Sequence, residues 1–294
     1  MKFAVYGRFN NTYTLASVDT LLNYLVEKAV DVLIESEFLE LIHSVASEKA
    51  FYGNFKTFET LDESFDILVS IGGDGTILRA VTFVTNLNIP IIGINTGRLG
   101  FLATIQVEGI KKAVQHILDG DYRISERTLL AVETTPENDT IKELNFALNE
   151  VAVSRKNTTS MITVETLLDG EYLTSYWSDG LIISTPTGST GYSLSCGGPV
   201  ITPGANNFVL TPIAPHNLSA RPLVIPDSTE IQLKVTGREE QHLVSLDSRI
   251  ATLNNDTTIK IKKANFKIKM IDLLDESFLK TLRKKMLWGE DKRN

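Results

Sequence analysis

The chain has 294 residues, of which 43% are hydrophobic, and it carries a formal net charge of −7. This length and apolar content are enough for two domains with packed cores, and they exclude a disordered chain. The acidic balance excludes a general nucleic-acid surface, and no apolar run is long enough to span a bilayer.

Cys196 is the only cysteine, so the chain can form no internal disulfide. A protein without disulfides, and without a signal-peptide pattern at its N-terminus, is expected in the reducing cytoplasm. The four histidines lack the spacing of metal ligands, and we therefore expect no metal held by protein side chains alone.

The first part of the chain alternates strand-like and helix-like patterns. Short apolar runs predict strands, and apolar residues at helical spacing predict helices between them. This alternation is typical of a mostly parallel sheet with helices on both faces, so we expect a Rossmann-like α/β domain. The predicted strands are 3–6, 32–34, 65–71 and 91–94, and the predicted helices are 17–28, 38–45, 77–84 and 107–118.

The pattern of apolar and polar residues changes after about Tyr122, where short alternating segments such as 129–134 and 161–167 dominate. Asp169-Gly170 between two such segments is a strong hairpin signal. Further alternation predicts a C-terminal β sandwich. The apolar spacing in 277–287 predicts a helix that returns to the first domain. The predicted domains are therefore 1–124 with 272–294, and 125–271.

The most informative segment is Gly72-Gly73-Asp74-Gly75-Thr76, between the predicted strand 65–71 and the predicted helix 77–84. Bare backbone amides and a helix N-terminus at such a junction attract a phosphate. A carboxylate does not help to hold phosphate, but it can remove a proton or grip a metal beside it. The loop is neither a P-loop nor the Rossmann dinucleotide fingerprint. The alternative is an ordinary turn in which Asp74 caps the helix.

A second glycine-bearing loop, 95–102, follows the predicted strand 91–94. In open α/β sheets, ligands bind beyond the carboxyl ends of the strands. Two such loops at neighbouring strand ends therefore favour a phosphate cleft over two plain connections.

The pair Asn149-Glu150 interrupts an apolar run. A polar pair in such a run is costly unless both side chains find partners. An amide and a carboxylate can hold two hydroxyls, as on a ribose. A turn at the end of a strand is the alternative.

Residues 184–199 contain many hydroxyls and glycines, which no regular element explains. Hydroxyls that both donate and accept, beside bare backbone, suit an adenine, an amide or ribose oxygens. A flexible linker is the alternative, although Pro186 and the flanking apolar runs argue against it. No Gly-x-Ser-x-Gly elbow occurs there, and we expect no serine nucleophile.

Together and in this order, these motifs resemble those of the NAD kinase family. The Gly-Gly-Asp-Gly loop also resembles lipid kinases and phosphofructokinases, but the loop 95–102 and the Ser/Thr/Gly segment favour NAD kinase. The family's two-part architecture agrees with the change in pattern near Tyr122. The matching segments are 72–76, 95–102, Asn149-Glu150, 178–195 and Gly197-Gly198-Pro199, so the resemblance extends from Phe65 to about Asp247.

The resemblance implies transfer of the γ-phosphoryl of ATP to the 2′-hydroxyl of the adenosine ribose of NAD, which yields NADP. It assigns the catalytic base to Asp74 and implies a divalent cation, Mg²⁺, held mainly by the phosphates. It also implies a homodimer or homotetramer, with neither nucleic acid nor membrane as partner. The other residues expected to bind substrate or nucleotide are Gly73, Gly75, Thr76, Arg79, Asn95, Asn149, Glu150, Asp179, Thr190, Gly191, Tyr192, Ser193, Leu194, Ser195 and Arg249.

The chain departs from the family pattern where Asp247-Ser248-Arg249 replaces the Asp-Gly-Gln of many bacterial members. Trp177 also stands where a polar residue is common. The sequence leaves open ATP or polyphosphate as donor, NAD or NADH as acceptor, the number of subunits, and feedback by NADPH. A lipid or sugar kinase, and a non-catalytic dinucleotide sensor, are the alternative interpretations.

Overall fold

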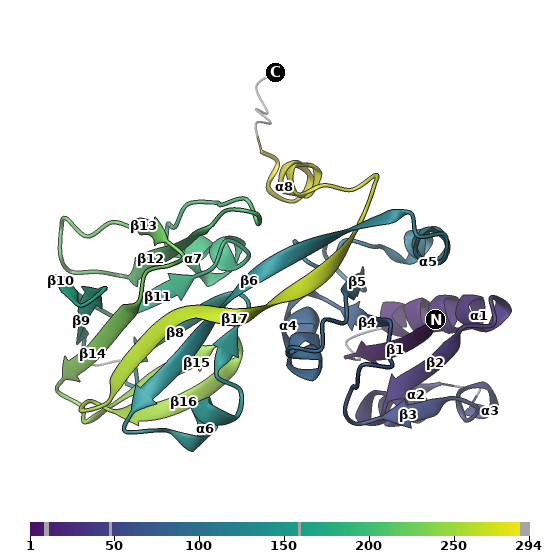
Figure 1. The fold of residues 1–294 in the computed structure, drawn as a ribbon, viewed down its shortest axis with the longest axis horizontal. Helices are drawn as coiled ribbons and strands as arrows, with labels where there is room; N and C mark the ends of the chain where they lie inside the picture. Colours follow the sequence, from purple (N-terminus) through teal and green to yellow (C-terminus); the bar gives the residue numbers. More distant parts are fainter. Residues whose placement is uncertain (9–11, 47–48, 158–159, 289–294) are drawn as a thin grey trace. The chain divides into compact units, whose positions relative to one another are not determined.

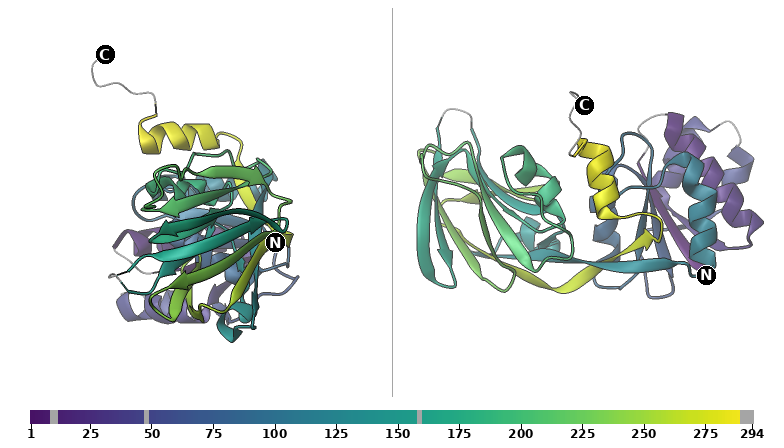
Figure 2. Two further views of the ribbon diagram at one scale, coloured as in Figure 1. Left: turned by 90° about the vertical axis from the view of Figure 1, so that its left-hand side faces the viewer. Right: turned by 90° about the horizontal axis from the view of Figure 1, so that it is seen from above.

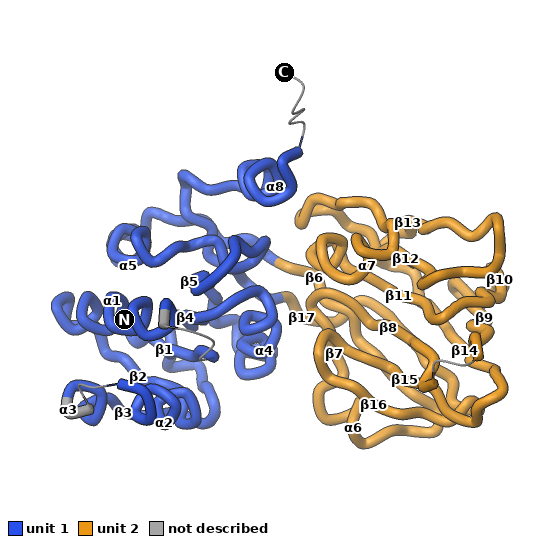
Figure 3. The backbone as a smooth tube through the Cα atoms, turned by 180° about the vertical axis from the view of Figure 1, so that it is seen from behind, with its two compact units in different colours: residues 1–126, 268–294 blue, residues 127–267 orange. Residues whose placement is uncertain are grey.

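The computed structural model describes residues 1–8, 12–46, 49–157 and 160–288. The chain divides into two compact units, 1–126 with 268–294 (unit 1) and 127–267 (unit 2) (Figure 3). The long strands β6 (Tyr122–Thr135) and β17 (Thr258–Leu273) run through the two boundaries. Each unit has a hydrophobic core of its own.

Unit 1 is built on a parallel sheet with the strand order β3-β2-β1-β4-β5, and β17 lies beside β5 (Figure 1). Gly7 pairs with Ile71, and Gly72 pairs with Asn95. The carboxyl ends of β1, β4 and β5 therefore meet at one edge of the sheet, as the sequence predicts. The bounds are β1 Lys2–Gly7, β2 Asp31–Glu35, β3 Lys56–Phe58, β4 Ile67–Gly72 and β5 Ile91–Asn95.

Helices cover both faces of this sheet, and β4 is therefore buried along its whole length. α1 and α5 lie side by side against the face that presents Phe3 and Val5 (Figure 2). α4 covers the opposite face, where the ring centroids of Phe83 and Tyr6 are 5.0 Å apart. The helices of unit 1 are α1 Thr12–Glu27, α2 Ser36–Val45, α3 Lys49–Tyr52, α4 Asp74–Val84, η1 Val107–Gly109, α5 Ile110–Leu118 and α8 Phe278–Met286.

The predicted helices differ in detail from the structure: α1 begins at Thr12 and α2 at Ser36, each before the predicted start. α4 begins at Asp74, three residues before the predicted start, because Gly73 is extended and stands as its N-cap. Asp74 therefore belongs to the first helical turn and does not precede it. The predicted helix 107–118 is a 3₁₀ turn followed by α5, with Gly109 at the junction.

Unit 2 is a β sandwich, which confirms the predicted fold class. Within unit 2, one sheet has the strand order β10-β9-β14-β17, with β6 beside β17 and β7 beside β6, and the other has the order β13-β12-β11-β8-β15-β16. β9 and β10 form the predicted hairpin, with Asp169 (φ 50°) and Gly170 (φ 82°) as its two turn residues. The strands are β7 Phe146–Ala147, β8 Glu150–Arg155, β9 Ile162–Leu168, β10 Glu171–Ser178, β11 Gly180–Ser184, β12 Asn207–Ile213, β13 Leu223–Pro226, β14 Ile231–Gly237, β15 Gln241–Leu246 and β16 Arg249–Asn254.

Short helical segments interrupt the sandwich, although the sequence pattern predicts an entirely β domain. They are α6 (Asp139–Glu143), η2 (Gly188–Thr190) and α7 (Tyr192–Ser195). The last two fall in the Ser/Thr/Gly segment, so this segment is a folded loop. None of the described helices combines the length and hydropathy needed to cross a bilayer.

Candidate active site

The glycine-rich turn of unit 1 connects the end of β4 to the start of α4. Gly72 has φ +153°, and a Cβ there would lie 2.2 Å from the Thr76 hydroxyl, so this position requires glycine. Gly73 and Gly75 have open space where a side chain would stand. The turn therefore offers bare backbone beside the positive end of α4. Thr76, by contrast, is buried.

The Asp74 carboxylate accepts three consecutive backbone N–H groups from the loop after β5. Oδ2 accepts from Phe101 at 2.8 Å, and Oδ1 accepts from Leu102 at 3.0 Å and from Ala103 at 2.9 Å. Gly100 permits this close approach, because a Cβ there would lie 1.9 Å from Oδ1. The sequence predicts that the two loops lie at neighbouring strand ends. The backbone contacts that join them are visible only in the structure.

One cation also faces Asp74. The Nζ of Lys285, on α8, lies 3.9 Å from Oδ2, and the Asp74 side chain is 28% exposed. A carboxylate has about four lone-pair positions. The N–H bonds occupy both positions of Oδ1 and one of Oδ2, so Oδ2 retains the capacity to accept a proton.

The other predicted residues of unit 1 have different surroundings. Asn95 is buried, and its amide is used inside its own loop: Oδ1 accepts from Gly97, and Nδ2 donates to the carbonyls of Arg98 and Ala103. Asn95 therefore shapes the loop 95–103. Arg79 is exposed on α4.

In unit 2, Asn149 and Glu150 stand at the start of β8, and Asp247 holds their backbone. Asp247 lies in the turn between β15 and β16 with φ 54°. Its Oδ2 accepts from Leu148 at 2.9 Å, and its Oδ1 accepts from Asn149 at 2.8 Å and from Glu150 at 3.2 Å. The turn thereby fixes the segment that carries the predicted amide and carboxylate.

The side chains of this pair are buried without full satisfaction. Within the described part of the chain, Oδ1 of Asn149 and Oε2 of Glu150 are buried and have no hydrogen-bond partner. Such atoms are costly unless a ligand or water satisfies them. The pair therefore has the chemistry of a site for hydroxyl donors.

The electrostatics of the pair are unusual. Burial, and then the Asp247 charge, raise the pKa of Glu150 from 4.5 to about 7, although the N–H of Tyr192 opposes the rise. Burial also raises the pKa of Asp247, against the effect of its three N–H partners and of Arg249. Two neighbouring carboxylates that both resist ionisation are typical of functional sites.

Arg249 contacts the chain that precedes Asn149, and its contact with nucleotide stays a prediction. Its guanidinium donates to the carbonyl of Leu144 at 2.6 Å and to the carbonyl of Phe146. It also lies over the Phe146 ring, 5.1 Å from the centroid. Arg249 and Asp247 thus hold consecutive parts of the chain that leads into Asn149.

Most hydroxyls of the Ser/Thr/Gly segment bond within the protein. Thr185 donates to the Leu148 carbonyl at 2.6 Å, Ser189 donates to the Pro186 carbonyl at 2.7 Å, and Ser193 pairs with Thr211 at 2.8 Å. The segment is thereby fastened beside Asn149 and Glu150.

The predicted residues 190–195 differ in exposure. Tyr192 and Ser195 are exposed, Thr190, Gly191 and Leu194 are half-buried, and Ser193 is fully buried. Thr190 also donates to the Thr187 carbonyl at 3.2 Å. Exposed groups are thus interleaved with groups that hold the loop.

Two further residues of unit 2 are paired. Asp179 is half-buried and forms an ion pair with Arg155 at 3.0 Å. Trp177 is 45% exposed, and its ring centroid lies 4.3 Å from that of His216.

The sequence alone does not identify Lys285, or the three N–H groups of residues 101–103 that bind the Asp74 carboxylate (the Asp74 latch). No local pattern marks Lys285, because it lies in an ordinary basic helix end. For Asp247, the sequence indicates only that the residues after it depart from the family pattern. Its exceptional feature is its contacts with residues 97 to 99 positions away, which the sequence does not display.

A carboxylate at a glycine-rich turn in one unit and a buried carboxylate pair in the other suit a two-domain phosphotransferase. The ATP-NAD kinase N-terminal domain model matches residues 7–122, and the ATP-NAD kinase C-terminal domain model matches residues 148–273. The chain belongs to the NAD kinase family. This confirms the family and the class of enzyme that the sequence motifs predict.

Relatives agree over the whole chain. An NAD kinase of Flavobacterium johnsoniae is 58% identical and one of Christiangramia forsetii is 59% identical, each over 294 residues and 100% of both chains. Among solved structures, an Archaeoglobus fulgidus NAD kinase in complex with ATP has a TM-score of 0.74 at 28% identity, covering 98% of this chain and 99% of that one. A yeast NADH kinase complexed with NADH shares the fold, with a TM-score of 0.86 at 24% identity and coverage of 99% and 88%.

Proposed function

We propose that this chain carries out the reaction of its family with ATP as donor and NAD as acceptor. The 2′-hydroxyl oxygen of the adenosine ribose attacks the γ-phosphorus of ATP, the bond to the β-phosphate oxygen breaks, and NADP and ADP leave. The observation that carries the proposal is Asp74, which is fixed by three N–H groups between two glycine-bearing loops and still has one free oxygen position.

Asp74 is proposed as the base. A ribose hydroxyl is a poor nucleophile, and a positioned carboxylate that takes its proton accelerates attack. Oδ2 is the atom assigned to the proton, because both lone pairs of Oδ1 are occupied by N–H groups. Lys285 near Oδ2 supplies positive charge where the phosphoryl group transfers.

Gly73 and Gly75 are proposed to hold phosphate through their backbone, with Arg79 one helical turn further along α4. The loose transition state of phosphoryl transfer leaves mainly positioning and charge neutralisation to the protein. Bare amides at a helix start are suited to both tasks.

Asn149 and Glu150 are proposed to bind the ribose hydroxyls of NAD. The proposal is supported by their two buried oxygens that lack partners among the described residues. Asp179 and the segment 190–195 are assigned to the base and amide ends of the dinucleotide. Tyr192 and Ser195 are its most exposed members.

A divalent cation, Mg²⁺, is proposed to accompany the donor and to neutralise its phosphates. In the part of the chain that the structure describes, no group of three or more His, Cys, Asp or Glu side chains has the geometry of a metal site. The ligands for this ion are therefore assigned mainly to the phosphates. A cytoplasmic homodimer or homotetramer completes the proposal.

The decisive experiment is a coupled assay of NADP formation by the purified chain with Mg²⁺ and with ATP or polyphosphate as donor. We expect NADP with ATP and NAD. Labelled ATP incubated with diacylglycerol or a hexose phosphate should label neither. Label in a lipid or sugar without NADP would overturn the proposal, and so would the absence of transfer to any acceptor.

A further inference from the structure

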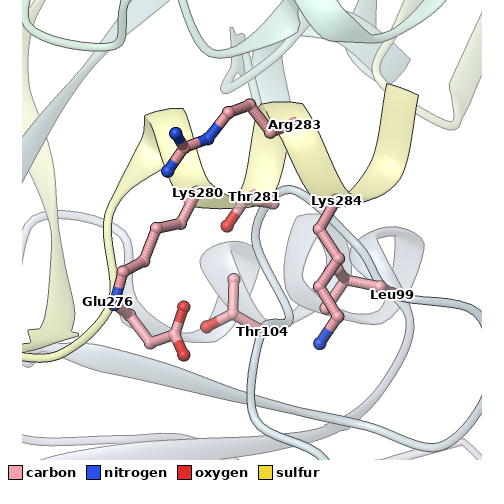
Figure 4. Close-up of a pocket in the computed structure, with 7 residues that line it drawn as sticks. All are labelled: Leu99, Thr104, Glu276, Lys280, Thr281, Arg283 and Lys284. Atoms are coloured by element: carbon pink, nitrogen blue, oxygen red, sulfur yellow. The ribbon is translucent and has the colours of Figure 1, made fainter. Parts of the chain in front are cut away.

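A cavity of about 490 Å³ lies in unit 1 between the loop after β5 and α8 (Figure 4). A volume of this size lies within the usual range of small-molecule sites, about 300–1,000 Å³. The lining residues come from the loop (Leu99 and Thr104) and from α8 with the turn before it (Glu276, Lys280, Thr281, Arg283 and Lys284). This cavity has no role in the reaction as described so far.

Three of the lining residues are cations. Lys280 donates to the Asp275 carbonyl. Arg283 and Lys284 are exposed, and within the described residues neither side chain has a hydrogen bond or an ion pair. Glu276 is the one carboxylate of the lining, and Figure 4 shows it near Lys280, on the opposite side from Lys284. The cavity therefore carries unpaired positive charge in a chain whose net charge is −7.

Basic residues in the last turn of a helix also stabilise the helix dipole. That effect explains why α8 ends in Arg283, Lys284 and Lys285. It requires neither a cavity between the helix and the 95–103 loop nor the hydroxyls of Thr104 and Thr281 in its wall. The combination is that of an anion site.

On each side of the cavity, a lining residue is followed in the sequence by a residue that lies near Asp74. Leu99 lines the cavity, and the next residue, Gly100, lies against Asp74 Oδ1. Lys284 lines the cavity, and Lys285 lies 3.9 Å from Asp74 Oδ2. The two segments that line the cavity therefore also carry the residues that contact Asp74.

We propose that this cavity binds the phosphate chain of the donor, with Arg283 and Lys284 as its main cations. Residues three and four apart on a helix have neighbouring side chains, about 5–6 Å between Cβ atoms. Lys280 is therefore a neighbour of both Arg283 and Lys284, and three cations around one cavity suit several phosphate groups better than a single anion. Arginine and lysine with hydroxyls beside them are the groups that bind phosphate oxygens. The proposal rests on the phosphotransferase function and adds a location for the phosphate chain of the donor.

The test separates binding from turnover by using inorganic tripolyphosphate without NAD. Calorimetric titration of the full chain compares the wild type with R283Q/K284Q. The matched control is K56Q/K234Q, which removes two charges from exposed positions of β3 and β14. We expect R283Q/K284Q to bind tripolyphosphate about tenfold or more weakly, and the control to bind like the wild type. Equal affinities of R283Q/K284Q and the wild type would overturn the proposal.

Steady-state kinetics then distinguish the two sources of a phosphate chain. In R283Q/K284Q the KM of ATP, of polyphosphate or of both should rise, while the KM of NAD stays within about twofold, because the cavity is assigned only to the donor. A rise in the KM of NAD alone would contradict the assignment. If the wild type forms no NADP with any donor, the proposed function fails. The titration still shows whether the cavity binds a phosphate chain.

Two further variants guard against a folding artefact. R283K/K284R keeps both charges and should bind tripolyphosphate like the wild type. K284Q alone changes one exposed side chain and should show part of the loss. Weak binding by R283K/K284R together with unchanged binding by K284Q would indicate a structural effect and would overturn the proposal.

Discussion

The two units use the same local device for different ends. In each, an aspartate accepts three consecutive N–H groups, one at Oδ2 and two at Oδ1: Asp74 from 101–103, and Asp247 from 148–150. Each contact joins distant parts of the chain and fixes a loop. What differs is the set of charges near the carboxylate, which is a lysine for Asp74 but both the Glu150 carboxyl and the Arg249 guanidinium for Asp247.

This difference assigns the roles. Lys285 places a positive charge 3.9 Å from Oδ2 of Asp74, which suits a base proposed to work beside an anionic donor. Burial, and then the Asp247 charge, raise the pKa of Glu150 to about 7, and the buried oxygens of Asn149 and Glu150 lack partners among the described residues. A buried amide oxygen and a buried carboxyl oxygen that are both unused acceptors suit the hydroxyls of a sugar better than a phosphate. The same three-bond arrangement thus supports the proposed base in one unit and the proposed hydroxyl site in the other.

The largest effect is expected for Asp74→Asn. Turnover should fall about 100- to 10,000-fold, because the base is lost. The amide oxygen still accepts N–H groups, so the Kd of NAD should change little. Measurement of kcat and of NAD binding by calorimetry checks this. Equal losses in both quantities would mean that Asp74 only latches the loop 101–103.

Asp247→Ala tests whether the bonds from the N–H groups of 148–150 to Asp247 (the Asp247 latch) stabilise the fold. Three N–H groups lose their acceptor, and we expect the free energy of unfolding to fall by about 4 kcal/mol, together with weaker NAD binding. Asp247→Asn keeps one acceptor oxygen and should lose less. Asp256→Ala, at an exposed position of the same unit, serves as the control in urea denaturation. Wild-type stability of Asp247→Ala would refute the latch.

Glu150→Gln should change the dependence of stability on pH. The folded chain holds a proton on Glu150 between pH 4.5 and about 7 that the unfolded chain has released. This contribution is complete below pH 4.5 and disappears as the pH rises through 7. The wild type should therefore lose up to about 3 kcal/mol more than the variant over this range. Denaturant titrations at a series of pH values measure the difference, and parallel curves would contradict it.

The smallest effect is expected for Arg249→Gln, which places the amide of many bacterial members at this position. Two carbonyl contacts are lost, so the free energy of unfolding should fall by about 1–2 kcal/mol. Arg249→Lys cannot reproduce the fork and should behave similarly. Thermal melts and NAD titrations test both variants. A large loss of NAD affinity without a change in stability would show that Arg249 contacts nucleotide.

Sequence patterns determine much of this protein. Strand and helix periodicity predicts the parallel sheet, the hairpin at Asp169-Gly170 and the final helix, because alternation and turn chemistry are local. The glycines around Asp74 mark a phosphate loop for the same reason. The start of α4 at Asp74 and the helical turns within 188–195 escape such reasoning, because capping and close packing decide them.

The partners of the carboxylates are decided by the tertiary structure alone. Residues 27 to 29 positions away supply the N–H groups for Asp74, residues 97 to 99 positions away supply those for Asp247, and α8 brings Lys285 to the catalytic loop. The pKa of a carboxyl depends on its burial and on the charges within a few ångströms. A sequence names the carboxylate, but only the folded chain determines what surrounds it and therefore what it does.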